Sequence, residues 1–184
     1  EAVMKLKSIS LYLFLFVTSF ITYANESTDG QFSKEMAFFA PYVGSWYSVF
    51  EEKDGKPVVS DVTQWQRALN GKALKTIHSV NNGSYGGESI IFWDKKKQKY
   101  VFYYFTTADF MTQGELEILS ENSFVAYEDV EGESAMSKGI TKVRSISTLS
   151  QEQITVATSY LKHGEWTEPA KRTYTRTDKK VKFK

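Results

Sequence analysis

The feature that most constrains this fold is an alternation of short β-prone runs and turn residues that begins at Val43 and continues almost to the C-terminus. Runs of β-branched and aromatic residues joined by short polar or glycine-containing segments are typical of an antiparallel meander. Two of the connections between predicted strands contain dipeptides typical of β-hairpins, Asp54-Gly55 and Asn70-Gly71. The predicted strands are Trp46–Glu52, Val58–Leu69, Lys72–Val80, Glu88–Trp93, Lys99–Thr106, Gln113–Leu119, Ser123–Val130, Lys138–Leu149, Gln153–Leu161 and Ala170–Thr177.

About ten strands with little helix leave two free sheet edges, and closure into a barrel removes both. Short connections favour up-and-down order. We therefore predict one all-β domain over residues 43–178, an up-and-down antiparallel meander closing into a barrel of eight to ten strands, with a two-sheet sandwich as the alternative. Before it, residues 25–42 contain apolar residues spaced for a short helix from Phe32 to Phe39, ended by Pro41. Residues 179–184 form a basic tail, which we expect to be solvated and disordered.

Residues 1–24 have the three parts of a secretory signal peptide. A basic start follows Met4, an apolar run extends from Ile9 to Ile21, and a small residue, Ala24, precedes the expected cleavage site. We assign no function to the three residues before Met4. The apolar run is shorter than the roughly 20 residues of a membrane-spanning helix. The sequence thus predicts a periplasmic or secreted protein with no stable membrane anchor after cleavage.

Composition argues against several classes of function. The chain has no cysteine, so a lipid anchor at the cleavage site and a disulfide framework are both excluded. Without residues 1–24, basic and acidic side chains are equal in number, and such a balance lacks the basic excess of nucleic-acid-binding proteins. There is no nucleophile elbow, phosphate loop or dinucleotide fingerprint, and the two histidines lack zinc-ligand spacing. We predict no metal and no cofactor.

Several motifs occur in an order that spans nearly all of residues 25–184. Gly44-Ser45-Trp46 opens the first strand, Trp65 leads to Asn70-Gly71, Phe92-Trp93-Asp94 comes next, and Trp166 leads to Thr173-Tyr174-Thr175-Arg176. This order resembles a bacterial lipocalin-like (calycin-type) β-barrel family of largely unknown function. The resemblance implies that Trp46 closes the barrel floor under an arginine from the last strand, Arg176, or Arg172 if the register differs. A guanidinium over an indole combines cation–π attraction with burial.

A barrel of this size can hold one small ligand, with alternate residues of each strand facing the lumen. We expect aromatic side chains to form the wall and an arginine, Arg67 or Arg144, to anchor a carboxylate such as that of a fatty acid. The alternatives are an ordinary packed core, and a one-residue register shift that turns these side chains to water. The candidate ligand-binding residues are Trp65, Arg67, His78, Glu88, Phe92, Tyr103, Tyr127 and Arg144.

Three functions remain open. The favoured one is an exported binding protein for a small hydrophobic or amphipathic molecule. The second is a barrel enzyme, an isomerase or hydrolase, that uses His78 and Glu88 in the same cavity, provided that the two converge within hydrogen-bonding reach. The third is an interaction protein that binds a partner through aromatic residues on its outer face.

Overall fold

The strands follow the predicted order in the computed structural model, which describes residues 30–51, 58–130 and 138–184. The signal-peptide region and the Asp54-Gly55 turn lie outside the described residues. A 3-10 segment, η1 (Lys34–Tyr42), precedes the strands, and η2 (Leu69–Gly71) is a short turn between two of them. The strands are β1 (Gly44–Glu51), β2 (Val58–Ala68), β3 (Ala73–Val80), β4 (Tyr85–Asp94), β5 (Lys99–Thr106), β6 (Met111–Ser120), β7 (Ser123–Asp129), β8 (Ile140–Ser150), β9 (Gln153–Lys162), β10 (Glu165–Trp166) and β11 (Ala170–Arg176).

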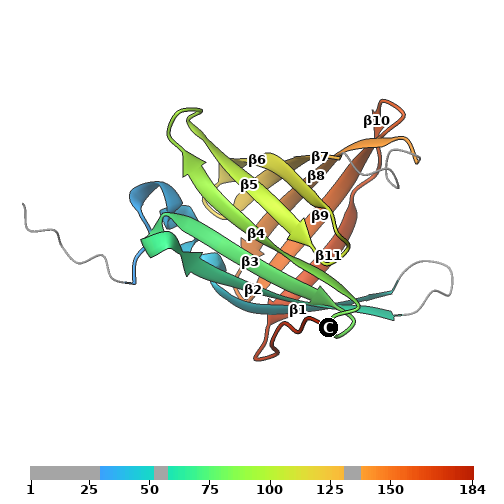
Figure 1. Cartoon of the computed structure of the whole chain (residues 1–184), viewed down its shortest axis with the longest axis horizontal. Coiled ribbons are helices and arrows are strands. Elements are labelled where there is room, and N and C mark those ends of the chain that lie inside the picture. Colours follow the sequence, from blue (N-terminus) through green and yellow to red (C-terminus); the bar gives the residue numbers. More distant parts are fainter. Residues whose placement is uncertain (1–29, 52–57, 131–137) are drawn as a thin grey trace, which may run out of the picture.

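The sheet closes on itself. Consecutive strands from β1 to β9 pair in antiparallel fashion, and β11 pairs with β9 on one side and with β1 on the other. The described strands therefore form a closed antiparallel meander of ten strands, as predicted, with the two-residue β10 added beside β9. Figure 1 shows these strands wrapping around one interior, with η1 at one end of the barrel. This architecture is consistent with a lipocalin-like barrel.

Tryptophan and arginine together seal the end that η1 covers. Trp46 is fully buried and donates from its indole nitrogen to Tyr42 O at 2.8 Å. The Arg176 guanidinium carbon lies 3.7 Å from the centre of the Trp46 ring, so the expected pairing with Arg176 is confirmed. Gly44 explains the spacing of the Gly-x-Trp motif, because a Cβ there would meet the Arg176 guanidinium nitrogen at 2.2 Å. Its φ of +136° also favours glycine.

Three local expectations were wrong. The N-terminal helix is a 3-10 segment that includes Pro41, so proline does not end it. The Asn70-Gly71 joint is a 3-10 turn rather than a two-residue hairpin, since the strands separate at Ala68 and Ala73. The fourth strand begins at Tyr85 rather than at Glu88, so the turn before it is limited to residues 81–84.

The basic tail lies against the barrel, contrary to the expectation of a disordered end. The backbone N–H of Val181 donates to Gln64 Oε1 at 3.3 Å, and that of Lys182 donates to Ser79 Oγ at 3.2 Å. The chain therefore ends on the outer face of β2 and β3, near the label C in Figure 1. Among the described residues, no helix has the length and apolar character needed to cross a bilayer.

Candidate functional site

The barrel interior contains a cavity of about 490 Å³ between the end closed by η1 and the opposite end, the mouth. Alternate residues line it, as pleated strands require. The half next to the closed end, which we call the floor, is apolar, and the half next to the mouth, which we call the rim, carries the charges. The floor includes Trp65, Ile91, Phe102, Leu116, Phe124 and Ile154. The rim includes Asp61, His78, Tyr104, Glu128, Arg172 and Tyr174.

The floor rests on the packed closed end. Tyr42 of η1 stacks on Trp65 with ring centres 5.4 Å apart, and Phe124 meets both rings edge-on or tilted. The Tyr42 hydroxyl donates to Asn122 O at 2.7 Å. Burial raises the pKa of this phenol to about 12, so it stays a neutral donor. The floor is thus a fixed aromatic surface.

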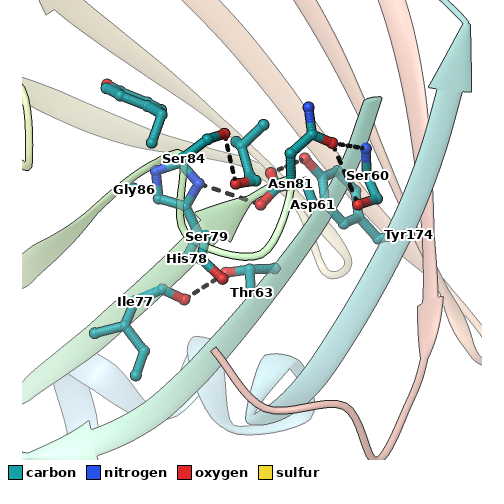
Figure 2. Close-up of polar contacts among 12 residues, drawn as sticks. Ser60, Asp61, Thr63, Ile77, His78, Ser79, Asn81, Ser84, Gly86 and Tyr174 are labelled. Carbon is teal, nitrogen blue, oxygen red and sulfur yellow. Dashed lines mark hydrogen bonds and ion pairs between the residues drawn. The ribbon is translucent and has the colours of Figure 1, made fainter. Parts of the chain in front are cut away.

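One side of the rim is a continuous hydrogen-bonded chain of side chains. Tyr174 donates to Asp61 Oδ2 at 2.9 Å, and Asp61 Oδ1 lies 3.2 Å from His78 Nδ1. Figure 2 shows Asp61 between His78 and Tyr174. The other ring nitrogen of His78 lies 2.7 Å from the Tyr104 hydroxyl, which in turn lies 3.0 Å from that of Tyr85. Both nitrogens of His78 are therefore engaged.

This hydrogen-bonded chain of side chains reaches from one strand to the next but one, because the strand between the two partners carries a small residue at that position. His78 on β3 reaches Tyr104 on β5 across Gly87 of β4, where a Cβ would meet the Tyr104 ring at 2.6 Å. Tyr174 on β11 reaches Asp61 on β2 across β1, whose residue opposite Asp61 is the small Ser48. The polar chain is therefore built into the backbone of several strands.

Two tyrosines of this hydrogen-bonded chain, Tyr104 and Tyr174, are held neutral. Burial raises the pKa of Tyr174, and the Asp61 carboxylate raises it further. Burial also raises the pKa of Tyr104, as do the Tyr85 hydroxyl and the nearby charges of Glu128 and Asp61. Protonated phenols can donate to Asp61 and His78, so the polar groups on this side of the rim find their hydrogen-bond partners within the protein.

The other side of the rim differs. Glu128 on β7 is five strands from Asp61 in either direction around the ring. Burial raises the pKa of its carboxyl, and no ion pair within the described residues includes it. Arg172, the cationic side chain of the lining, lies over the Phe50 ring of β1, with 4.0 Å between the guanidinium carbon and the ring centre. A buried carboxylate without a cationic partner is costly.

Two of the eight residues predicted from the sequence line this cavity, namely Trp65 in the floor and His78 in the rim. Arg67 lies instead at the closed end, where its Nε donates to Gln31 O. It therefore braces the segment before η1, and the expectation that it reaches the lumen was wrong.

The other five predicted residues point to the outer face, because the true parity of β4, β5, β7 and β8 is shifted by one residue. Glu88 pairs with Lys75 at 2.7 Å, and Phe92 stacks on Tyr103 with ring centres 6.4 Å apart. Tyr127 is 41% exposed, and Arg144 lies over the ring of Trp166 in β10. Phe92, Tyr103 and Tyr127 therefore lie on the outer face, where the hypothesis of an interaction protein requires aromatic residues.

The outward placement of Glu88 removes the proposed catalytic pair. His78 faces the lumen, whereas Glu88 faces the outer surface, so the two cannot act on one substrate. In the part of the chain that the structure describes, no group of three or more histidine, cysteine or acidic side chains could hold a metal ion.

Comparisons with known proteins add no name to this site. No protein-family model matches the chain, and no curated protein matches it.

Proposed function

We propose that this chain is an exported, lipocalin-like binding protein that holds a small hydrophobic or amphipathic molecule in the barrel lumen. The observation that carries the proposal is the cavity, with its apolar floor and charged rim. Its volume of about 490 Å³ falls within the range of small-molecule sites, roughly 300 to 1,000 Å³. An amphipathic ligand would place its apolar part on the floor and its polar group at the rim.

Export and periplasmic or secreted location remain part of this proposal, on the basis of the signal-peptide pattern in residues 1–24. Membership of the bacterial lipocalin-like family is likewise proposed. It rests on Gly44, Trp46 and Arg176, which act together as the resemblance implies.

Binding is favoured over catalysis by the state of His78. Its two ring nitrogens are occupied by Asp61 and Tyr104, so neither is directed at a substrate. A general base needs its nitrogen within reach of the proton that it removes. In this arrangement the histidine acts as a bridge within the rim.

The test is displacement of a neutral apolar dye, N-phenyl-1-naphthylamine, by decanol and longer aliphatic alcohols. We expect dye fluorescence to rise on binding to the protein and to fall as the alcohols compete. Ala126→Trp would fill the lumen and abolish dye binding, because Ala126 lines the cavity. The matched control is Tyr127→Trp on the outer face of the same strand, which should leave dye binding intact. Equal binding by both variants would place the dye outside the lumen and overturn the proposal.

A further inference from the structure

The two sides of the rim differ in charge balance. The Asp61 carboxylate accepts from Tyr174 and lies against His78, and Arg172 is close enough to Tyr174 to lower the pKa of that phenol. The negative charge on this side therefore has compensating partners. Glu128, on the opposite side, has no ion pair with any residue that the structure describes. Of the two acidic side chains that line the cavity, Asp61 and Glu128, only Asp61 has an ion-pair contact among the described residues.

Aromatic residues of the cavity lining lie two strands away from Glu128 on either side. Glu128 pairs in register with Val143, and Val143 pairs with Tyr160, whose ring lines the cavity one strand further on. On the other side Glu128 pairs with Gly114, which leaves its lumen side open to the ring of Phe102. A carboxylate and aromatic rings that line one cavity can together recognise an ammonium group, through ion pairing and cation–π attraction.

We propose that the lumen ligand is an aliphatic or aromatic amine, whose ammonium group is held by Glu128 among Phe102, Tyr104 and Tyr160 while its apolar part lies on the floor. This inference rests on the proposed function and specifies its ligand class. It replaces the carboxylate ligand expected from Arg67 and Arg144, since neither arginine faces the lumen.

The stability cost of Glu128 supports a binding role. Burial raises the pKa of its carboxyl, because desolvation of the charged form outweighs the lowering influence of the nearby Thr112 hydroxyl. Glutamine would fill the same space without that penalty. A bound ammonium group would supply the missing charge.

The experiment compares three probes with the same chain and different head groups, namely decylamine, decanol and decanoic acid, at pH 7.5 and below their aggregation concentrations. Each competes with N-phenyl-1-naphthylamine for the full-length protein. We expect decylamine to bind at least about tenfold more tightly than decanol, and decanoic acid to bind more weakly than decanol.

Two variants of adjacent residues sharpen the comparison. Glu128→Gln should lower decylamine affinity about tenfold and leave decanol affinity unchanged. Asp129→Asn, on the outer face where Asp129 pairs with Lys142, should change neither affinity. A thermal melt of each variant checks that the fold is intact.

The outcomes separate the two proposals. Equal affinity for all three probes, or tightest binding of decanoic acid, would overturn the amine assignment and leave a lumen-binding protein in place. An unchanged decylamine affinity in Glu128→Gln would overturn it as well. Failure of wild-type protein to bind the dye and all three probes would overturn both proposals.

Discussion

The two ends of the barrel differ in how well their charged side chains are partnered. At the closed end, Arg176 covers Trp46 and donates to the carbonyl oxygens of Val43 and Pro41 at 2.6 and 2.8 Å. At the mouth, Glu128 is half-buried and has no ion-pair partner among the described residues. The closed end maximises packing and hydrogen bonding, whereas the mouth retains an unfavourable charge beside an open cavity. Such local departures from optimal stability are expected at functional sites.

The largest expected effect is at the closed end. Trp46→Ala should lower the free energy of unfolding by about 3 to 5 kcal/mol, because it removes a fully buried indole and leaves a cavity. Urea unfolding followed by circular dichroism measures the change. Val49→Ala on the exposed side of β1 is the control and should cost far less. A loss below about 1 kcal/mol for Trp46→Ala would mean that the closed end is not the stability centre.

Arg176→Ala comes next, with an expected loss of about 2 kcal/mol. The substitution removes the cation–π contact with Trp46 and leaves the Val43 and Pro41 carbonyl oxygens without their donor. The same measurement on Arg172→Ala, whose guanidinium lies over Phe50 at the mouth, should show a smaller loss. A larger loss of unfolding free energy for Arg172→Ala than for Arg176→Ala would contradict the distinction between the two ends.

Tyr174→Phe tests the side of the rim where Asp61 is hydrogen-bonded to its neighbours. It removes the donor to Asp61 Oδ2 and should cost about 1 to 2 kcal/mol. It should also reduce the loss of stability at alkaline pH. Since the pKa of Tyr174 is raised in the fold, wild-type stability is intact below the ordinary value of 10 and falls as pH rises above it. Melting temperatures from pH 7 to 11 would show this, and identical alkaline profiles would argue against it.

The smallest expected effect is a gain of stability rather than a loss. Glu128→Gln should raise the melting temperature at pH 7.5 by a few degrees, since it removes a desolvated charge. Because the carboxyl pKa is raised in the fold, the contribution of Glu128 to stability is most favourable below the ordinary value of 4.5 and becomes less favourable as pH rises through the folded-state pKa. The advantage of the variant should therefore disappear near pH 4. A variant less stable than wild type at pH 7.5 would show that Glu128 supports the fold.

The sequence predicted the barrel because each turn and each alternating run is a local signal. The pairing of Trp46 with Arg176 was also accessible, since both residues sit at the ends of strands that must meet when the barrel closes. Trp65 and His78 were placed on the correct face because β2 and β3 alternate clearly.

The rim residues other than His78 were missed because the face of each strand that turns inward depends on loop length. A shift of one residue moves every side chain of a strand to the opposite face. On β5 no alternation of polar and apolar residues is visible, because five of the six residues from Tyr100 to Phe105 are aromatic. On β4, Glu88 and Phe92 were expected to face inward, whereas the actual register pairs Thr76 with Ser89 on the lumen side. On β7, Tyr127 was expected to face the lumen, whereas its neighbour Glu128 lines the cavity. Extending the parity of Trp65 back along β2 would have identified Asp61.

The central claim, that the lumen is a ligand site, is tested most directly by NMR of methyl-labelled protein with decylamine. Nuclear Overhauser contacts between the decyl chain and protein methyl groups report where the chain lies. We expect contacts to Ile91, Leu116 and Ile154, whose side chains line the floor, and none to Val49 or Leu119, which are exposed on the outer surface. Contacts confined to the outer methyl groups would contradict the account.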